Sequence, residues 1–274
     1  MTDRYAVMGN PIAHSRSPEI HRMFAEQTHQ DLSYEAILVP ADGFRQAVQD
    51  FFERGGQGIN VTVPFKQDAF LIADQTHPRA EQAGAVNTLM RTVDGVLVGD
   101  NTDGEGLLRD LQRNHGVELA GRRVLLLGAG GAARGVMAPI LEAGPLQLFV
   151  ANRTPERADE LAERFRDLGS VAAGGFTDVG VLPFDVIINA TSASLRGEVP
   201  SLPATLIMPT TVCYDMVYAR EPTAFMRWAL GHGAAQAIDG LGMLVEQAAA
   251  SFEIWRGILP ETAAVINALR HAPP

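Results

Sequence analysis

The sequence predicts an α/β protein of two domains with mainly parallel strands, on the basis of three observations. The chain has 274 residues, which is more than one typical domain and fewer than three. Short apolar runs alternate with longer amphipathic ones, as in strand–helix–strand units. A second series of such units begins near the middle of the chain, around a glycine-rich turn. With 46% hydrophobic and 20% charged residues, the composition is that of an ordinary globular protein.

The first series of strands and helices ends in a predicted hairpin. Strands are expected at residues 5–8, 34–38 and 58–62, and helices at residues 17–27 and 43–54. Two further strand-like runs, 86–92 and 96–99, flank Asp94-Gly95. An Asp-Gly pair between two such runs is a strong signal for a two-residue hairpin turn. We therefore expect a β-hairpin at this point.

The second series begins near residues 101–104. A compact apolar strand at 123–127 precedes a helix that runs to about Ala143, where Gly144-Pro145 ends it. The last long helix is expected at residues 239–256, with Asp239 as its N-cap. Between them we expect strands at residues 148–151, 186–189 and 212–214, and a helix at residues 155–168.

Composition excludes several classes of partner. The formal net charge of −10 argues against nucleic-acid binding, which needs a basic surface. The single cysteine, Cys213, excludes an internal disulfide and fits a reducing compartment. There is no apolar run of membrane-spanning length, no secretory signal and no metal-binding pattern of histidines or cysteines. We expect a soluble cytoplasmic protein, monomeric or homodimeric, without a metal or a membrane partner.

The glycine turn after the strand at 123–127 predicts a Rossmann-type dinucleotide-binding domain. Gly128, Gly130 and Ala133 occupy the three small-residue positions of the dinucleotide-binding pattern. The first glycine permits the tight turn, the second lets the backbone approach the pyrophosphate, and the helix N-terminus offers N–H groups to the phosphates. The expected cofactor-binding residues of the turn are Gly128, Ala129, Gly130, Gly131 and Ala132. The alternative is a purely structural turn.

The residues after the next strand favour NADP over NAD. An acidic residue there would bind the ribose 2′-hydroxyl of NAD and repel a 2′-phosphate. This chain has Asn152-Arg153-Thr154 instead, with Arg157 one helical turn further on. Two guanidinium groups beside a helix N-terminus suit a phosphate dianion. The alternative is that both arginines pair with Glu156 or Glu160.

Two polar clusters elsewhere in the chain are candidates for chemistry. The segment 60–66 ends a predicted strand with Asn60, Thr62 and Lys66, and the segment 101–104 places Asp103 just before a helix. Strand ends in open α/β sheets are where ligands bind. Each has an ordinary alternative, since Lys66 could be a surface lysine and Asp103 a helix cap. Their combination with a nucleotide-binding turn favours the functional interpretation.

Taken together, these motifs resemble the shikimate dehydrogenase family, and the match runs over nearly the whole chain. Each motif alone has low specificity, but their ordered set has high specificity. In chain order they are Ser15-Arg16-Ser17-Pro18 with His21, residues 60–66, Gly84-Ala85-Val86-Asn87-Thr88, residues 101–104, the turn at 128–133, Asn152-Arg153-Thr154, Asn189-Ala190-Thr191-Ser192, Tyr214-Asp215-Met216-Val217-Tyr218, and Asp239-Gly240-Leu241-Gly242-Met243 with Gln247.

The resemblance implies a role for each motif residue. Ser15 and Ser17 would bind the substrate carboxylate, and Lys66 and Asp103 would form the catalytic pair. Met216 and Gly240 would lie near the nicotinamide. The remaining substrate-binding residues would be Thr62, Asn87, Tyr218 and Gln247, and Asp103 would also hold a ring hydroxyl.

The resemblance also implies the domain organisation and the reaction. Residues 1–103 with 240–274 would form the substrate-binding catalytic domain, and residues 104–239 the NADP-binding domain, with the active site in the cleft between them. The expected reaction is the reversible, NADP-dependent reduction of 3-dehydroshikimate to shikimate, in the biosynthesis of chorismate and the aromatic amino acids. As a hypothesis, Lys66 exchanges the hydroxyl proton while hydride moves to or from the nicotinamide.

The chain departs from the family pattern at two positions. The family often has asparagine where this chain has Arg22, and glycine where it has Ser194. The first change is expected to alter only a surface helix. The second would shift a cofactor-side loop if the backbone there requires a positive φ.

Three alternatives remain at this point. A relative that also uses quinate would share most of the motifs. A non-catalytic ligand sensor could share the fold, but it would be free to lose Lys66 or Asp103, and both are present. Another two-domain NADP enzyme, such as a methylenetetrahydrofolate dehydrogenase or a glutamyl-tRNA reductase, is disfavoured by the serine motif.

Overall fold

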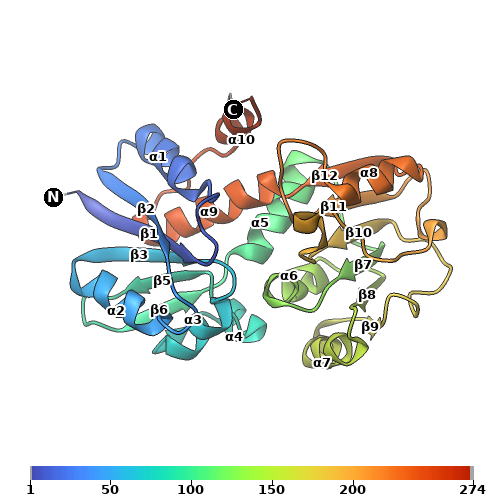
Figure 1. The fold of residues 1–274 in the computed structure, drawn as a ribbon, viewed down its shortest axis with the longest axis horizontal. Helices are drawn as coiled ribbons and strands as arrows, with labels where there is room; N and C mark the ends of the chain where they lie inside the picture. The colour runs from blue at the N-terminus through green and yellow to red at the C-terminus, as the bar shows by residue number, and fades with distance from the viewer. Residues whose placement is uncertain (1, 272–274) are drawn as a thin grey trace. The chain divides into compact units, whose positions relative to one another are not determined.

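The computed structural model describes residues 2–271, and the chain divides into two compact units (Figure 1). The N-terminal unit takes in the chain up to Gly106 together with the chain from Leu244 onward, and the central unit is Leu107–Met243. The boundaries fall inside helix α5 (Asp103–Arg109) and helix α9 (Leu241–Arg256). The C-terminal helices therefore belong to the same unit as the first strands.

The sheet of the N-terminal unit has six strands in the order β2-β1-β3-β5-β6-β4. Among the described pairs, only β5 runs against its neighbours, so the sheet is mainly parallel. The predicted hairpin is confirmed, because β5 and β6 pair antiparallel and Gly95 adopts a φ of 85° in the turn. The strands are β1 (Asp3–Gly9), β2 (Leu32–Leu38), β3 (Gly56–Val61), β4 (Gln75–Thr76), β5 (Thr88–Arg91) and β6 (Leu97–Asp100).

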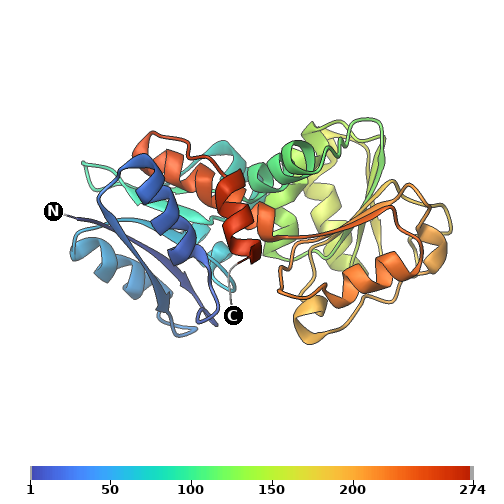
Figure 2. The same ribbon diagram turned by 90° about the horizontal axis from the view of Figure 1, so that it is seen from above.

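Helices cover both faces of this sheet. Ile59 and Val61 of β3 belong to the apolar cluster that α2 and α3 complete, whereas Gly58 and Asn60 point to the other face, toward α9. A Cβ on Gly58 would lie 2.5 Å from the Trp255 indole, so this glycine lets α9 pack closely. Seen from above, α1 lies over β1 and β2 (Figure 2). These helices are α1 (Ser17–Thr28), α2 (Phe44–Glu53), α3 (Lys66–Ile72), α4 (Pro78–Ala83) and α10 (Ala263–His271).

The central unit has the predicted Rossmann-type fold. Its six strands are all parallel, in the order β12-β11-β10-β7-β8-β9. Numbered from β7, this is the strand order 3-2-1-4-5-6 of dinucleotide-binding domains. The fold-class prediction is confirmed. The elements are β7 (Arg123–Leu127), α6 (Gly131–Glu142), β8 (Gln147–Ala151), α7 (Pro155–Phe165), β9 (Val171–Gly174), β10 (Val186–Asn189), β11 (Val212–Asp215), α8 (Ala224–Gly231) and β12 (Gln236–Asp239).

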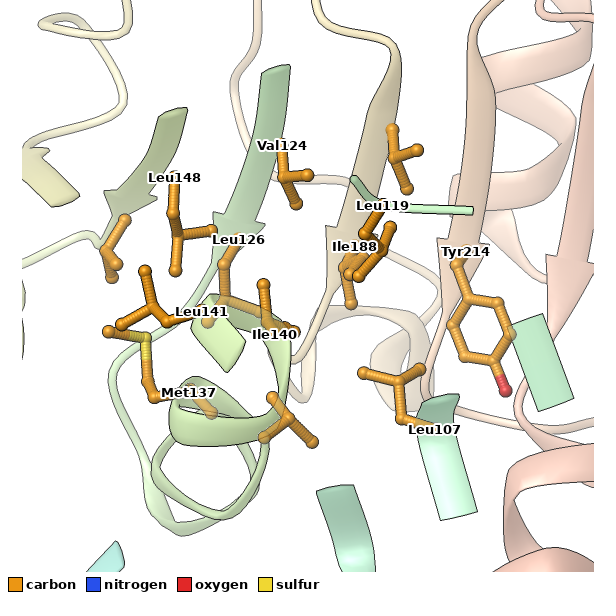
Figure 3. Close-up of a cluster of buried hydrophobic side chains, with 14 of the residues drawn as sticks. Leu107, Leu119, Val124, Leu126, Met137, Ile140, Leu141, Leu148, Ile188 and Tyr214 are labelled. Atoms are coloured by element: carbon orange, nitrogen blue, oxygen red, sulfur yellow. The ribbon is translucent and has the colours of Figure 1, made fainter. Parts of the chain in front are cut away.

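The first strand of this sheet is buried on both faces, as parallel sheets require. Val124 and Leu126 of β7 point to one apolar cluster, and Leu125 and Leu127 point to a second on the opposite face. Figure 3 shows the first cluster, in which α6 contributes its apolar side chains to the face of β7, β8 and β10. This packing fixes the N-terminus of α6 at the end of β7, where the glycine turn lies.

Two predicted boundaries are wrong in detail. Asp239 is not the N-cap of the last helix, because it is the final residue of β12 and the helix begins at Leu241. Its carboxylate still accepts the N–H of Leu241 at 3.4 Å. The helix predicted at 155–168 ends at Phe165, and a 3₁₀ turn, Arg166–Leu168, completes the range. In residues 2–271, no helix is both long and apolar enough to span a bilayer.

Candidate active site

Lys66 and Asp103 meet in the N-terminal unit. Lys66 is the first residue of α3 and Asp103 is the first residue of α5. The Lys66 Nζ atom donates to the Asp103 Oδ2 atom at 2.6 Å, and the two side chains are only 17% and 6% exposed. Since a charge so far removed from water needs a partner, the ion pair accounts for the burial of both groups. The fold thus brings together two residues 37 positions apart.

The identity of Lys66 carries a signal that the motif analysis overlooked. Lys66 is the only lysine in the sequence, and every other member of the 22 lysines and arginines is an arginine. An arginine keeps its proton at any physiological pH, whereas a lysine amine can release one. A chain that uses arginine for every other cation has a lysine at the position where proton exchange is expected.

The turn that precedes α5 is held in place by its own polar side chains. The Asp103 N–H donates to the Asn101 Oδ1 atom at 3.0 Å, and Asn101 donates its amide to the Ala85 carbonyl at 2.9 Å. One residue earlier than that asparagine, Asp100 accepts two hydrogen bonds from Arg79, at 2.7 and 2.9 Å. The backbone that carries Asp103 is therefore anchored to α4 and to the segment that leads into β5.

Asn87 and Gln247 complete a hydrogen-bonded group around this pair. The Asn87 amide donates to the Asp103 Oδ1 atom at 2.9 Å and lies 3.3 Å from the Gln247 Oε1 atom. Its own oxygen accepts the N–H of Thr102 at 2.9 Å. We call Lys66, Asn87, Asp103 and Gln247 the Lys66 group. Its members come from separate segments of the chain. The Lys66 ammonium is the one cation in the group, and the other members offer hydrogen-bonding groups.

The two serines of the first motif lie together at the start of α1. The Ser15 hydroxyl is 3.3 Å from the Ser17 hydroxyl and accepts the Ser17 N–H at 3.4 Å. Burial raises the pKa of the Tyr34 phenol well above its usual value, and a hydrogen bond with Ser17 opposes that shift. Tyr34 in turn donates to the Asn60 Oδ1 atom at 2.7 Å. Hydroxyls at a helix N-terminus suit an anionic group such as a carboxylate.

A buried hub of polar side chains connects the serines to the Lys66 group. The Asn60 amide donates to the Ser251 Oγ atom at 2.9 Å, and this hydroxyl is 2.7 Å from that of Thr88 and 3.2 Å from that of Thr102. Ser251 also donates to the Gln247 carbonyl at 3.1 Å. We call Asn60, Thr88, Thr102 and Ser251 the Ser251 hub. All four are buried, so the hub rigidifies both ends of the candidate site.

Sequence reasoning missed most of this hub. Asn60 was part of a motif but had no assigned role, and Ser251 was not singled out. One signal was available, because Ser251 follows Gln247 by four residues and therefore lies on the same face of a largely apolar helix.

Two expected substrate ligands, Thr62 and Tyr218, belong neither to the Lys66 group nor to the Ser251 hub. Thr62 follows β3, is half-buried and donates its backbone N–H to the Met8 carbonyl at 2.9 Å. Tyr218 belongs to the central unit, three residues beyond the end of β11. It is therefore not in the unit that contains the other expected substrate ligands.

The glycine turn of the central unit fits a phosphate. Gly128 adopts a φ of 107°, a conformation that favours glycine, directly after β7. A Cβ added to Gly130 or Gly131 would meet no atom within 4 Å, so the missing side chains leave open space at the N-terminus of α6. Ala133, at the third small position, is fully buried. Ala129 and Ala132 lie in the same turn, and the chemistry of the cradle suits a pyrophosphate.

The residues after β8 offer exposed positive charge. Arg153 and Arg157 are exposed, and neither forms an ion pair within residues 2–271. The alternative pairing with Glu156 or Glu160 is therefore not observed. Asn152 donates its amide to the Thr154 carbonyl at 2.9 Å, and Thr154 precedes α7 without using its hydroxyl as a cap. The four residues Asn152, Arg153, Thr154 and Arg157 suit a 2′-phosphate.

Met216 and Gly240 are in close contact. A Cβ on Gly240 would lie 2.3 Å from the Met216 carbonyl oxygen, and the Gly240 N–H donates to the Val217 carbonyl at 3.2 Å. Only glycine fits at position 240, because the obstacle is backbone.

Comparison with known proteins identifies the family. Three family models match: the shikimate dehydrogenase substrate binding domain at residues 7–89, shikimate / quinate 5-dehydrogenase at residues 110–196, and the shikimate 5′-dehydrogenase C-terminal domain at residues 240–270. A protein of Alkalilimnicola ehrlichii named shikimate dehydrogenase (NADP(+)) is 61% identical over 270 residues, covering 98% of this chain and 99% of that one. The chain belongs to the shikimate dehydrogenase family.

Solved structures agree with this membership. The crystal structure of an Ael1 enzyme from Pseudomonas putida superposes with a TM-score of 0.91 at 45% identity, covering 98% of each chain. A shikimate 5-dehydrogenase from Thermus thermophilus, in complex with NADP(H) and shikimate, superposes with a TM-score of 0.87 at 35% identity, covering 99% of this chain and 100% of that one. The family resemblance predicted from the motifs is confirmed.

The two departures from the shikimate dehydrogenase pattern are accommodated without strain. Arg22 is exposed on α1 and pairs with Glu26 one turn away, at 2.5 Å. Ser194 lies in a short 3₁₀ helix, Ala193–Arg196, and His29 is the one non-glycine residue with a positive φ in residues 2–271. Position 194 therefore does not need the positive φ that would have strained a serine. Within the same residues, no group of three potential metal ligands is found.

Proposed function

We propose that this protein is an NADP-dependent shikimate dehydrogenase, which interconverts 3-dehydroshikimate and shikimate in the biosynthesis of chorismate and the aromatic amino acids. The observation that carries the proposal is the Lys66–Asp103 ion pair, enclosed with Asn87 and Gln247. Family membership supports it, as does the relative named for NADP(+), which is 61% identical. The related structure that contains shikimate and NADP(H) supports it as well.

Lys66 is the proposed proton-exchanging residue. When bound, the cofactor supplies hydride transfer at the ring carbon that carries the oxygen. In the reductive direction, an N–H of the Lys66 ammonium donates its proton to that oxygen, and in the oxidative direction the neutral amine takes the hydroxyl proton back. Asp103 holds the Lys66 nitrogen in place at 2.6 Å and accepts a hydrogen bond from a neighbouring ring hydroxyl.

The remaining substrate contacts follow from the chemistry of the side chains. Ser15 and Ser17 bind the carboxylate through their hydroxyls at the start of α1. Asn87, Gln247 and Thr62 hold ring hydroxyls, and Tyr218 contributes a phenol from the central unit. Positioning of this kind is a large part of catalysis, because a ring held in one orientation reacts far faster than a free one.

The cofactor is held by the central unit. The turn formed by Gly128, Ala129, Gly130, Gly131 and Ala132 binds the pyrophosphate. Arg153 and Arg157, with Asn152 and Thr154, bind the 2′-phosphate, and Met216 and Gly240 contact the nicotinamide. Functionally, residues 1–103 with 240–274 act on the substrate and residues 104–239 bind NADP.

One experiment tests the proposed function. Purified protein is mixed with NADP⁺ and shikimate, and the formation of NADPH is followed by its absorbance; we expect steady turnover. Parallel assays with quinate, and with NAD⁺ in place of NADP⁺, separate the enzyme from a relative of broader specificity. Binding of shikimate without any NADPH formation would instead favour a ligand sensor.

A further inference from the structure

We propose that Asp215 is a positioning residue for the nicotinamide end of the cofactor, and that the Ser194 hydroxyl is one of the groups that hold it. The inference rests on the proposed function and adds to it residues with no assigned role. Asp215 is the last residue of β11 and is followed directly by Met216. Its side chain is fully buried.

The Asp215 carboxylate is saturated with hydrogen bonds but forms no ion pair among residues 2–271. Its Oδ2 atom accepts from the hydroxyls of Ser194 and Thr223, both at 2.6 Å. Its Oδ1 atom accepts from the Asn189 amide and from the Val217 N–H, both at 3.1 Å. Burial raises the pKa of Asp215, and these four hydrogen bonds oppose the shift. Burying a carboxylate without a counter-ion costs desolvation free energy that an apolar side chain at the same position would not. This cost points to a role for Asp215 other than packing.

The first element that the carboxylate fixes is the segment at residues 216–218. The bond from the Val217 N–H to Asp215 turns the chain sharply after the strand. The Met216 N–H donates to the Asn189 carbonyl at 2.9 Å, and the Val217 carbonyl accepts the Gly240 N–H at 3.2 Å. The backbone of Met216 and Val217 is thus held at three points, one of them Asp215 itself.

The second element is the loop at residues 189–194, which approaches the glycine turn at Gly128. The Asn189 side chain accepts both the N–H and the hydroxyl of Thr191, at 3.1 and 2.7 Å. The following residue, Ala190, lies close to the glycine turn: a Cβ added to Gly128 would be 3.2 Å from the Ala190 carbonyl oxygen. One carboxylate therefore ties the loop beside the pyrophosphate cradle to the segment proposed to meet the nicotinamide.

Ser194 is the member of this arrangement that is best suited to a test. Thr223 has a second task, since its hydroxyl also caps α8 by accepting the Met226 N–H at 3.1 Å. The Ser194 hydroxyl donates only to Asp215, and its other described contact is with the Asn189 amide at 3.4 Å. Ser194→Ala therefore removes one support of the carboxylate and leaves the helix cap intact.

The test compares Ser194→Ala with Ser194→Thr, Asp215→Asn and a control, Thr211→Val. Thr211 is a buried hydroxyl of the same unit that bonds only to Phe184 and Met208, away from Asp215. For each protein, steady-state kinetics give kcat and KM for NADP⁺ and for shikimate. Titrations give the affinity for NADP⁺ and for 2′-phospho-ADP-ribose, which lacks the nicotinamide.

We expect Ser194→Ala to lower kcat/KM for NADP⁺ by about 10-fold, because a hydrogen bond to a buried charge is lost, with KM for shikimate nearly unchanged. Its affinity for NADP⁺ should fall more than its affinity for 2′-phospho-ADP-ribose. Ser194→Thr should restore most of the loss, and Asp215→Asn should exceed it. Thr211→Val should lower stability without changing kcat/KM.

Equal losses for NADP⁺ and 2′-phospho-ADP-ribose would overturn the proposal, and so would unchanged kinetics in Ser194→Ala. If Asp215→Asn does not fold, the Ser194→Ala and Ser194→Thr variants still test whether Asp215 positions the nicotinamide end of the cofactor. A wild-type protein that binds NADP⁺ without oxidising shikimate would refute the proposed function, while the two titrations would still test the role of Asp215.

Discussion

The two units differ in the kind of group that forms their candidate sites, which is side chains in one and largely backbone in the other. In the N-terminal unit, the Lys66 group and the Ser251 hub are side chains from distant segments, largely buried and joined by hydrogen bonds. In the central unit, the proposed phosphate-binding surface is backbone in the glycine turn together with the exposed guanidinium groups of Arg153 and Arg157.

This contrast suggests how the two units divide recognition between them. A network of buried polar side chains can discriminate among ring hydroxyls, since a ligand that leaves one buried partner unpaired is penalised. A backbone cradle recognises the phosphates common to all dinucleotides, and in the proposed site the two arginines would distinguish NADP from NAD. Substitutions in the N-terminal unit should therefore affect shikimate and turnover, and substitutions in the central unit should affect the cofactor.

The largest expected effect is that of Lys66→Ala. Because the proposed proton donor is lost, kcat should fall by about 10²–10⁴-fold. NADP⁺ affinity, measured by titration, should stay near that of the wild-type protein, since the proposed cofactor surface is in the other unit. A fall in NADP⁺ affinity as large as the fall in kcat would break the comparison between the units.

Arg153→Gln should act in the opposite way. Losing one charged contact with the 2′-phosphate should raise KM for NADP⁺ by about 10–100-fold, leaving KM for shikimate and turnover with NAD⁺ nearly unchanged. Arg166→Gln is the control, because Arg166 is exposed in the same unit and pairs with Glu163. Equal behaviour of the two variants would contradict the assignment of the 2′-phosphate site.

Ser251→Ala tests whether the hub is part of the substrate site. Removing this hydroxyl takes one of several hydrogen-bond partners from the Asn60 amide and from the hydroxyls of Thr88 and Thr102, so the free energy of unfolding should fall by about 1–3 kcal/mol. KM for shikimate should also rise, with NADP⁺ affinity unchanged. Ser33→Ala, at an exposed position on β2, is the control. A Ser251→Ala protein with reduced stability but normal KM would make the hub purely structural.

The smallest effect concerns acid stability. His21 is buried against Tyr34, with ring centroids 4.1 Å apart, and burial lowers the pKa of His21 to about 3, with Asn60 opposing the shift. As the pH falls below about 6.5, the unfolded chain binds a proton that the folded His21 does not, so stability is lost progressively toward pH 3.

His21→Phe should remove this contribution. Between pH 7 and pH 5 the variant should lose about 1–2 kcal/mol less unfolding free energy than the wild-type protein, as measured by urea denaturation. His14→Phe, at an exposed position, is the control variant. Identical acid losses in the His21 variant and the wild type would show that His21 does not titrate as described.

The sequence allowed prediction where a residue type states a backbone requirement. Gly128 adopts a positive φ, and the Met216 backbone lies so close to Gly240 that no side chain fits there. Both positions can be recognised in the sequence because glycine is the residue that meets these requirements. The hairpin at Asp94-Gly95 was predictable for the same reason. The strand β12 was missed because a short edge strand of mixed polarity has no clear period, and Asp239 was therefore assigned to the helix that follows it.

Contacts between distant side chains were not predictable from residue type. Asn60 and Ser251 are 191 positions apart. The sequence identifies one as an asparagine in a strand and the other as a serine in a helix, but it does not indicate that they form a hydrogen bond. The same holds for Asp215 and Ser194, which only the parallel pairing of β10 and β11 brings together. Motifs could name Lys66 and Asp103, but only the fold gives their separation.

The measurement that tests the central claim most directly is the turnover of Lys66→Arg. An arginine keeps the positive charge and can pair with Asp103, but it does not release its proton near neutral pH. If Lys66 transfers the proton, kcat with saturating shikimate and NADP⁺ should fall by at least about 100-fold, while NADP⁺ affinity is retained. Turnover within about threefold of the wild-type rate would show that the charge alone suffices, and it would contradict the account.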